Sequence, residues 1–304
     1  MNYVLELNND QLVELITHYE TKASTIDVEN TVVAFEGSNY NVSVYESKKV
    51  MFQGKKAKPQ YDHWVDVFKI SVPEALDKPI EKPKPITSFY EPSIGSDESG
   101  SGDYFGPLVV AAVYVSKADE NFLKTFPIND SKDMDDATII EVIPQILEKI
   151  PYALMVLNNE KYNQMIEKGY NLNALKAYLH AQAHKAISAK VGKKGPIVVD
   201  QFVSPQKYYE YLKDFDDVPQ VQTFITQAEK HYASVALSSM VARFAFLNQL
   251  RKLSKEVHMS LQKGASSSVD EQIAFVIKTH GERQLREIAK VHFANTLKAK
   301  ALIK

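Results

Sequence analysis

The most constraining feature of this 304-residue sequence is a continuous apolar run at residues 107–115, PLVVAAVYV. An uninterrupted apolar run is typical of a strand that is buried on both faces, because a half-exposed strand alternates apolar and polar residues. Residues 152–157 and 196–199 repeat this pattern, and helical periods separate the runs at residues 136–150 and 174–191. Buried strands separated by helices favour an α/β fold, with a mixed sheet and flanking helices.

The first 78 residues have a different pattern, which predicts a small α+β domain. Helical spacing occurs at residues 11–22 and again near residues 60–69. Between these helices lie three short strand-like runs, at residues 31–35, 40–45 and 49–53.

Four prolines lie within residues 79–92, PIEKPKPITSFYEP. Proline lacks a backbone donor and biases the residue before it toward extended structure. We therefore expect a stiff linker here, between the small α+β domain at residues 1–78 and a second domain at residues 93–304.

Composition excludes several classes of function. The chain has no cysteine, which rules out disulfides, thiolate metal sites and cysteine nucleophiles, and which fits a cytoplasmic location. No apolar run reaches the roughly 18 to 20 residues of a membrane span, and residues 1–10 lack the pattern of a secretory signal. The formal net charge is −2, so binding to nucleic acid would have to come from local basic patches.

Two adjacent acids, Asp97 and Glu98, stand between strand-like residues 93–96 and a Gly-Ser-Gly sequence at residues 100–102. Neighbouring side chains on a strand point to opposite faces, so both acids serve one site only if the chain twists or one reaches around an edge. The glycines permit such a turn and allow a polymer backbone to come close. The alternative is a solvated acidic turn.

Two further acids occupy positions where functional sites are often found. Asp200 ends a buried strand, as site residues of open α/β sheets do, although it could instead cap the segment that begins at Ser204. Glu229 is expected in the first turn of a long helix that extends to about residue 257. There the helix dipole favours a carboxylate whatever its function.

Four carboxylates that converge in a partly buried site repel one another unless cations neutralise them. Oxygen ligands without histidine favour Mg²⁺ or Mn²⁺. Two such ions, roughly 3.5 to 4 Å apart, can activate a water and stabilise the leaving oxygen of a phosphodiester. The acidic residues therefore predict metal-dependent phosphodiester hydrolysis.

Taken together, these motifs resemble those of the type 2 ribonucleases H, and within that family the bacterial ribonuclease HIII group. Further points of likeness are the small N-terminal domain, GDYFGP at residues 102–107, SVALSSMVAR at residues 234–243 and HFANT at residues 292–296. The resemblance covers essentially the whole chain. It implies a ribonuclease H-like catalytic domain, preceded by a domain that resembles the TATA-box-binding-protein fold.

The resemblance also implies an activity and assigns roles to residues. The implied enzyme is a monomeric endonuclease that uses two Mg²⁺ or Mn²⁺ ions to cut the RNA strand of RNA/DNA hybrids, leaving 5′-phosphate and 3′-hydroxyl ends. The metal-binding and catalytic carboxylates fall on Asp97, Glu98, Asp200 and Glu229. The substrate-binding residues fall on Gly100, Ser101 and Gly102, whose backbone would read ribose 2′-hydroxyls, and on Ser131 and Lys132, which would hold a phosphate.

The sequence departs from ribonuclease HII in three ways. Ser101 stands where that group has a basic residue, and Glu229 stands where it has aspartate. The C-terminal Tyr-Gly-Trp stretch that senses an RNA-to-DNA junction has no counterpart. We therefore expect cleavage within stretches of several ribonucleotides rather than at a single embedded one.

A lysine-rich segment at residues 46–60 is a candidate for binding the substrate backbone. Lysines neutralise phosphates, and nearby aromatic residues offer flat surfaces for sugars or bases. The lysines that we assign to substrate binding are Lys48, Lys49, Lys55 and Lys56. The alternative is a solvated turn beside a half-buried sheet.

Two other functions remain open from the sequence. One is a junction resolvase or integrase-like nuclease on the same fold. The other is a non-catalytic protein that binds hybrids and whose acids hold a structural metal.

Overall fold

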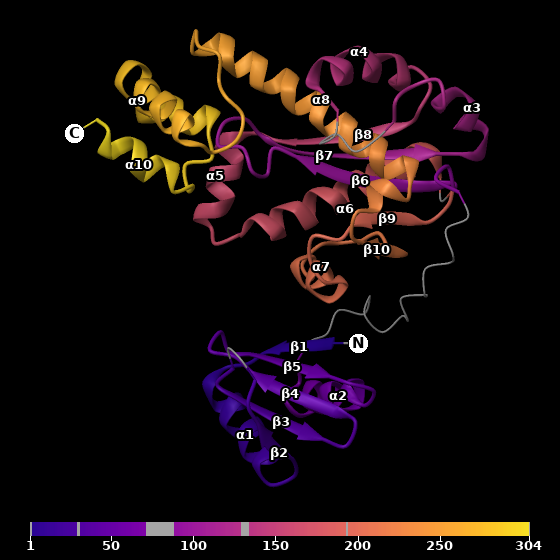
Figure 1. The fold of residues 1–304 in the computed structure, drawn as a ribbon, viewed down its shortest axis with the longest axis vertical. Helices are drawn as coiled ribbons and strands as arrows, with labels where there is room; N and C mark the ends of the chain where they lie inside the picture. Colours follow the sequence, from indigo (N-terminus) through magenta and orange to yellow (C-terminus); the bar gives the residue numbers. More distant parts are fainter. Residues whose placement is uncertain (1, 29–30, 71–87, 129–133, 193, 304) are drawn as a thin grey trace. The chain divides into compact units, whose positions relative to one another are not determined.

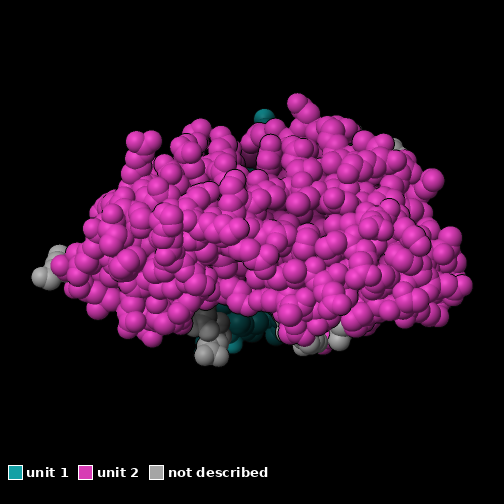
Figure 2. Space-filling view, turned by 90° about the horizontal axis from the view of Figure 1, so that it is seen from above, with its two compact units in different colours: residues 1–73 teal, residues 74–304 magenta. Residues whose placement is uncertain are grey.

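The computed structural model describes residues 2–28, 31–70, 88–128, 134–192 and 194–303. The chain divides into two compact units, residues 1–73 and 74–304, which Figure 1 draws as ribbons and Figure 2 colours separately. Most of the expected linker, residues 79–87, lies outside the described residues. In the described part of the chain, no helix is long and apolar enough to cross a membrane.

The first unit is a five-stranded antiparallel sheet with two helices. Its strands are ordered β1-β5-β4-β3-β2, and their bounds are β1 Asn2–Glu6, β2 Ser24–Ile26, β3 Val33–Gly37, β4 Tyr40–Val44 and β5 Lys49–Gln53. Its helices are α1 (Asn9–Glu20) and α2 (Ala57–Val67). They contact each other, since Trp64 Nε1 of α2 donates a hydrogen bond to Tyr19 Oη of α1 at 3.0 Å. Both side chains are buried in a core shared with the strands.

The second unit is built on a mixed five-stranded sheet ordered β10-β9-β6-β7-β8. The strand bounds are β6 Ser93–Ser99, β7 Leu108–Val115, β8 Tyr152–Leu157, β9 Ile197–Asp200 and β10 Thr223–Ile225. Strand β9 runs parallel to β6 and β10, whereas β7 pairs antiparallel with β6 and β8. The expected mixed sheet is therefore confirmed.

Helices cover both faces of this sheet, as Figure 1 shows. Val109, Ala111 and Val113 of β7 belong to one core with helices α4 (Asp136–Leu147) and α8 (Ala233–Glu256). The alternating residues Leu108, Val110 and Ala112 belong to a second core with α6 (Leu172–Val191). The continuous apolar run of β7 is thus explained by burial on both faces.

Further helices complete the described part of the second unit. They are η2 Lys117–Asp119, α3 Glu120–Leu123, α5 Asn159–Glu167, α7 Pro205–Tyr211, η3 Ala228–Lys230, α9 Ser267–Ile288 and α10 Asn295–Ala301. The segment between α9 and α10 packs against the turn that follows β6, since Lys290 N donates to Tyr104 O and Gly106 N donates to Ile288 O, both at 2.9 Å.

Candidate active site

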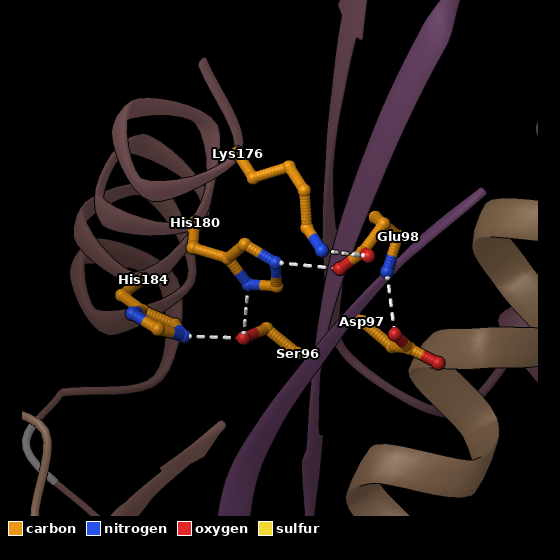
Figure 3. Close-up of polar contacts among 6 residues, drawn as sticks. All are labelled: Ser96, Asp97, Glu98, Lys176, His180 and His184. Atoms are coloured by element: carbon orange, nitrogen blue, oxygen red, sulfur yellow. Dashed lines mark hydrogen bonds and ion pairs between the residues drawn. The ribbon is translucent and has the colours of Figure 1, made fainter. Parts of the chain in front are cut away.

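The side chains of Asp97 and Glu98 leave β6 on opposite sides, as the alternation of a strand requires (Figure 3). Glu98 points toward α6, whereas Asp97 hydrogen-bonds Ser239 of α8. The two residues remain connected, because the backbone N–H of Glu98 donates to Asp97 Oδ1 at 2.7 Å. The pair is therefore not a fully solvated acidic turn, since both side chains are largely enclosed.

Glu98 is held by two basic residues of α6. Lys176 Nζ forms an ion pair with Glu98 Oε1, and His180 Nε2 lies 3.2 Å from Glu98 Oε2. Burial by itself raises the pKa of Glu98. The hydrogen bond from His180 and the charges of His180 and Lys176 outweigh burial and lower the pKa to about 2. Glu98 is therefore ionised at neutral pH.

The pKa of Asp97 is shifted in the opposite direction to that of Glu98. Burial raises its pKa well above the usual range, and repulsion from Glu98 and Asp200 raises it further. The hydrogen bonds from the Glu98 backbone and from Ser239 offset this only in part. A positive charge bound at this position would relieve the repulsion.

Asp200 is brought to Asp97 by the parallel pairing of β9 with β6. Ser96 pairs with Val199, so the next residues, Asp97 and Asp200, stand beside each other on neighbouring strands, which lie about 4.8 Å apart. Asp200 Oδ1 accepts a hydrogen bond from the backbone N–H of Ala228 at 3.2 Å. The cap of α7 is instead Ser204, whose side chain accepts from Lys207 N at 3.2 Å. The alternative role for Asp200 as a helix cap is therefore wrong.

Glu229 lies in the short turn η3, and our expectation that it stands in the first turn of the long helix is wrong. Helix α8 begins at Ala233, and its N-cap residue is Tyr232. Gln227 adopts a left-handed backbone conformation (φ 58°) that separates η3 from the preceding strand β10. Glu229 is 8% exposed, and the contact between Ala228 and Asp200 brings its turn to the end of β9.

The donors available at this end of the sheet fit a hard divalent cation, because the carboxylates of Asp97, Glu98 and Asp200 interact electrostatically and supply only oxygen. In the described part of the chain, however, no three His, Asp or Glu side chains are grouped closely enough to hold a metal ion. In this arrangement Lys176 is the ion-pair partner of Glu98, and His180 is its hydrogen-bond partner.

The two glycines of the Gly-Ser-Gly sequence differ in whether their backbone angle and packing exclude a side chain. Gly100 has a φ of +88°, and a Cβ atom there would lie 2.2 Å from the carbonyl oxygen of Pro107. Gly102 is exposed and does not have a positive φ, and a Cβ atom there would meet no atom within 4 Å. The fold therefore requires glycine at residue 100, whereas nothing in the packing of the described residues requires it at residue 102.

The turn after this sequence is held by a buried lysine, Lys290, that the sequence patterns did not single out. Lys290 is fully buried, and its Nζ donates to the carbonyl oxygens of Asp103 (2.8 Å) and Gly106 (2.5 Å). Burial lowers the pKa of Lys290 to about 7. Nothing in the local sequence distinguishes this lysine from an exposed one.

The other candidate residues belong to the first unit or fall outside the described residues. Ser131 and Lys132 fall outside the described residues. The four candidate lysines of the first unit, Lys48, Lys49, Lys55 and Lys56, are all exposed. Lys48 and Lys49 stand at the start of β5, whereas Lys55 and Lys56 follow its end, so the strand separates them into two pairs.

Four neighbours of the carboxylates were not predicted from the sequence: Lys176, Ser96, His180 and His184. The three α6 residues are spaced four apart, which places them on one face of the helix. That spacing could have indicated from the sequence that the three residues share a helix face. It does not reveal which strand the face contacts.

Comparisons with known proteins assign a class to each part of the chain. Residues 94–296 match the family described as ribonuclease HII, and residues 2–68 match a domain of unknown function, DUF3378. The first match places the second unit among the ribonuclease H enzymes.

Individual relatives extend the similarity over the full length. Ribonuclease HIII of Bacillus licheniformis is 39% identical over 98% of this chain and 97% of that protein, and ribonuclease HIII of Bacillus subtilis is 41% identical over 86% and 85%. The crystal structure of Bst-RNase HIII in complex with Mn²⁺ has a TM-score of 0.69 at 33% identity, and it covers 100% of this chain and 99% of that one. The chain therefore belongs to the ribonuclease HIII group of the ribonuclease HII family and is a ribonuclease H enzyme.

Proposed function

We propose that this enzyme cleaves the RNA strand of RNA/DNA hybrids by two-metal-ion hydrolysis, leaving 5′-phosphate and 3′-hydroxyl ends. The observation that carries the proposal is the parallel pairing of β6 with β9, which sets Asp97 beside Asp200. The mutual repulsion of Asp97, Glu98 and Asp200 supports a site built for cations.

The proposed metal ligands are Asp97, Glu98, Asp200 and Glu229. Two Mg²⁺ or Mn²⁺ ions, when bound, would supply an activated water and charge stabilisation for the leaving 3′-oxygen. Bst-RNase HIII has been crystallised in complex with Mn²⁺, which supports the same type of ion here.

Selectivity for RNA is proposed to arise at residues 100–102. A glycine that the packing does not require, at residue 102, supports close approach of a substrate backbone, because a side chain would obstruct it. Only the ribose 2′-hydroxyl distinguishes the RNA strand locally, and backbone groups at this turn can hydrogen-bond it.

The remaining substrate contacts are proposed for Ser131 and Lys132, which would hold a phosphate, and for the lysine pairs at the two ends of β5. Separation of Lys48 and Lys49 from Lys55 and Lys56 by a five-residue strand suits contacts to different phosphates. In this proposal residues 1–78 form the binding domain, residues 79–92 the linker and residues 93–304 the catalytic domain.

A single cleavage assay tests the proposed function. Matched RNA/DNA, DNA/DNA, RNA/RNA and single-ribonucleotide duplexes are incubated with the enzyme and either Mg²⁺ or Mn²⁺. We expect cleavage of the RNA/DNA hybrid alone. With the RNA strand labelled at its 3′ end, the labelled product carries the new 5′-phosphate, and its migration in a gel should change on treatment with phosphatase. Preferential cutting of a DNA junction, or tight binding of the hybrid without turnover, would contradict the proposal.

A further inference from the structure

Three polar residues of α6 form a buried row against β6, in contrast to the usual solvent exposure of such side chains (Figure 3). Lys176 is 7% exposed, and both His180 and His184 are 0% exposed. Lys176 and His180 both contact Glu98, whereas His184 does not.

Hydrogen bonds connect His184 to Glu98 through two intermediate groups. His184 Nε2 lies 2.7 Å from Ser96 Oγ, and Ser96 Oγ lies 2.7 Å from His180 Nδ1. His180 Nε2 then lies 3.2 Å from Glu98 Oε2. The chain therefore runs from a buried histidine to a carboxylate of the proposed metal site.

Ser96 stands two residues before Glu98 on β6, so the two side chains lie on the same face of the strand. Ser96 Oγ is the shared partner of both histidine rings. Its contact with Nδ1 sets the orientation of the His180 ring that presents Nε2 to Glu98.

The far end of the chain is enclosed. His184 is fully buried, and its Nδ1 has no hydrogen-bond partner among the described residues. Ser96 Oγ is therefore the group that holds the His184 ring through Nε2.

We propose that His184, Ser96 and His180 are positioning residues that orient Glu98 for cation binding through a continuous chain of hydrogen bonds. The proposal rests on the function proposed above. Ser96 and the stacked ring of Phe202, 5.4 Å from the His180 ring, fix the imidazole on Oε2. Lys176 lies on the other carboxylate oxygen, Oε1, so His180 and Lys176 each hold one oxygen of Glu98.

NMR of the histidine rings provides a direct test that does not depend on metal or activity. The ring nitrogen signals of His180 and His184 are recorded in wild type and in Ser96→Ala, each with ¹⁵N-labelled histidine. Because Ser96 Oγ contacts both rings, we expect the ring signals of both histidines to shift in Ser96→Ala. Unchanged ring signals for either histidine overturn the proposal.

Metal affinity without nucleic acid tests the positioning role. Mn²⁺ binding is measured by electron paramagnetic resonance for wild type, Ser96→Ala, His184→Leu and His184→Gln, since a glutamine amide can hydrogen-bond Ser96 in place of Nε2. We expect about tenfold weaker binding in Ser96→Ala and His184→Leu, as is typical when a partner of a metal ligand is lost. We expect His184→Gln to stay close to wild type.

Two further results separate this inference from the proposed function. If Glu98→Gln does not weaken Mn²⁺ binding, the proposed metal site is wrong, whereas the ring nitrogen signals still report on the chain itself. If Glu98→Gln weakens binding but His184→Leu and His184→Gln bind Mn²⁺ equally well, the positioning role is overturned. Thermal unfolding of each variant shows whether a weak binder is folded.

Discussion

Gly95 of β6 and Ser234 of α8 approach so closely that a Cβ atom on Gly95 would lie 2.4 Å from the carbonyl carbon of Ser234. Ser238 Oγ, one helical turn on, donates to Gly95 O at 3.0 Å. This backbone contact fixes the distance between α8 and β6, and thus the position of Ser239 relative to Asp97.

The first prediction concerns this contact. Because the clash of Gly95→Ala is with backbone atoms that cannot rotate away, we expect it to lower the free energy of unfolding by about 3 kcal/mol or more. Urea denaturation measures the change. Gly102→Ala is the control, since a Cβ atom there meets no neighbour. Equal stability of the two variants would contradict the described packing.

The second prediction separates structural from substrate-related glycines. Gly100→Ala should lower stability, because its positive φ and the nearby Pro107 carbonyl disfavour a side chain. Gly102→Ala should retain wild-type stability and raise KM for the hybrid, because the added methyl group lies where the substrate backbone approaches. Steady-state kinetics and thermal unfolding check both effects. A wild-type KM for Gly102→Ala would remove this residue from the proposed interface.

The third prediction concerns Lys176. Lys176→Met leaves the ionised Glu98 largely enclosed without its ion-pair partner, and removal of one partner of a buried pair typically costs about 3 kcal/mol. The double variant Lys176→Met with Glu98→Gln should regain most of this loss, because no charge is left uncompensated. Urea unfolding of the four proteins at neutral pH gives the coupling. Additive effects of the two substitutions would show that the pair does not interact.

The fourth prediction is a pH dependence that arises from Glu98. Its pKa is lowered from 4.5 to about 2, so the folded protein binds this proton less tightly than the unfolded chain. Glu98 therefore stabilises the fold above pH 4.5, and this contribution is lost as the pH falls toward 2. Relative to Glu98→Gln, wild type should lose about 3 kcal/mol over this window, by urea unfolding at successive pH values. A constant difference would contradict the described environment of Glu98.

Patterns of burial explain which elements the sequence predicts well. The strands at residues 49–53 and 152–157 have the predicted bounds, since their apolar residues stand out against turn residues on either side. Strands β1 and β2 were not predicted. They are the outer strands of their sheet, and β2 has only three residues, two of which are exposed.

The candidate site was predictable where it depends on strand ends and was not where it depends on helix packing. A carboxylate at the end of a buried strand identified Asp200, and parallel pairing brings it to Asp97. The position of Glu229 was predicted incorrectly. Its short turn η3 is followed closely by the helix that starts at Ala233, and the residue types do not mark where the turn ends and the helix begins. The contact of Lys176 with Glu98 depends on how α6 docks on the sheet, which no local pattern encodes.

The most direct test of the account replaces one carboxylate at a time and measures metal-dependent cleavage of a hybrid. Asp97→Asn and Asp200→Asn keep size and hydrogen-bonding capacity but remove charge, and Asp217→Asn is the matched control because its side chain is 85% exposed. The account predicts near-complete loss of Mg²⁺- or Mn²⁺-dependent cleavage for the first two variants and wild-type cleavage for the control. Near-wild-type cleavage by Asp97→Asn would contradict it.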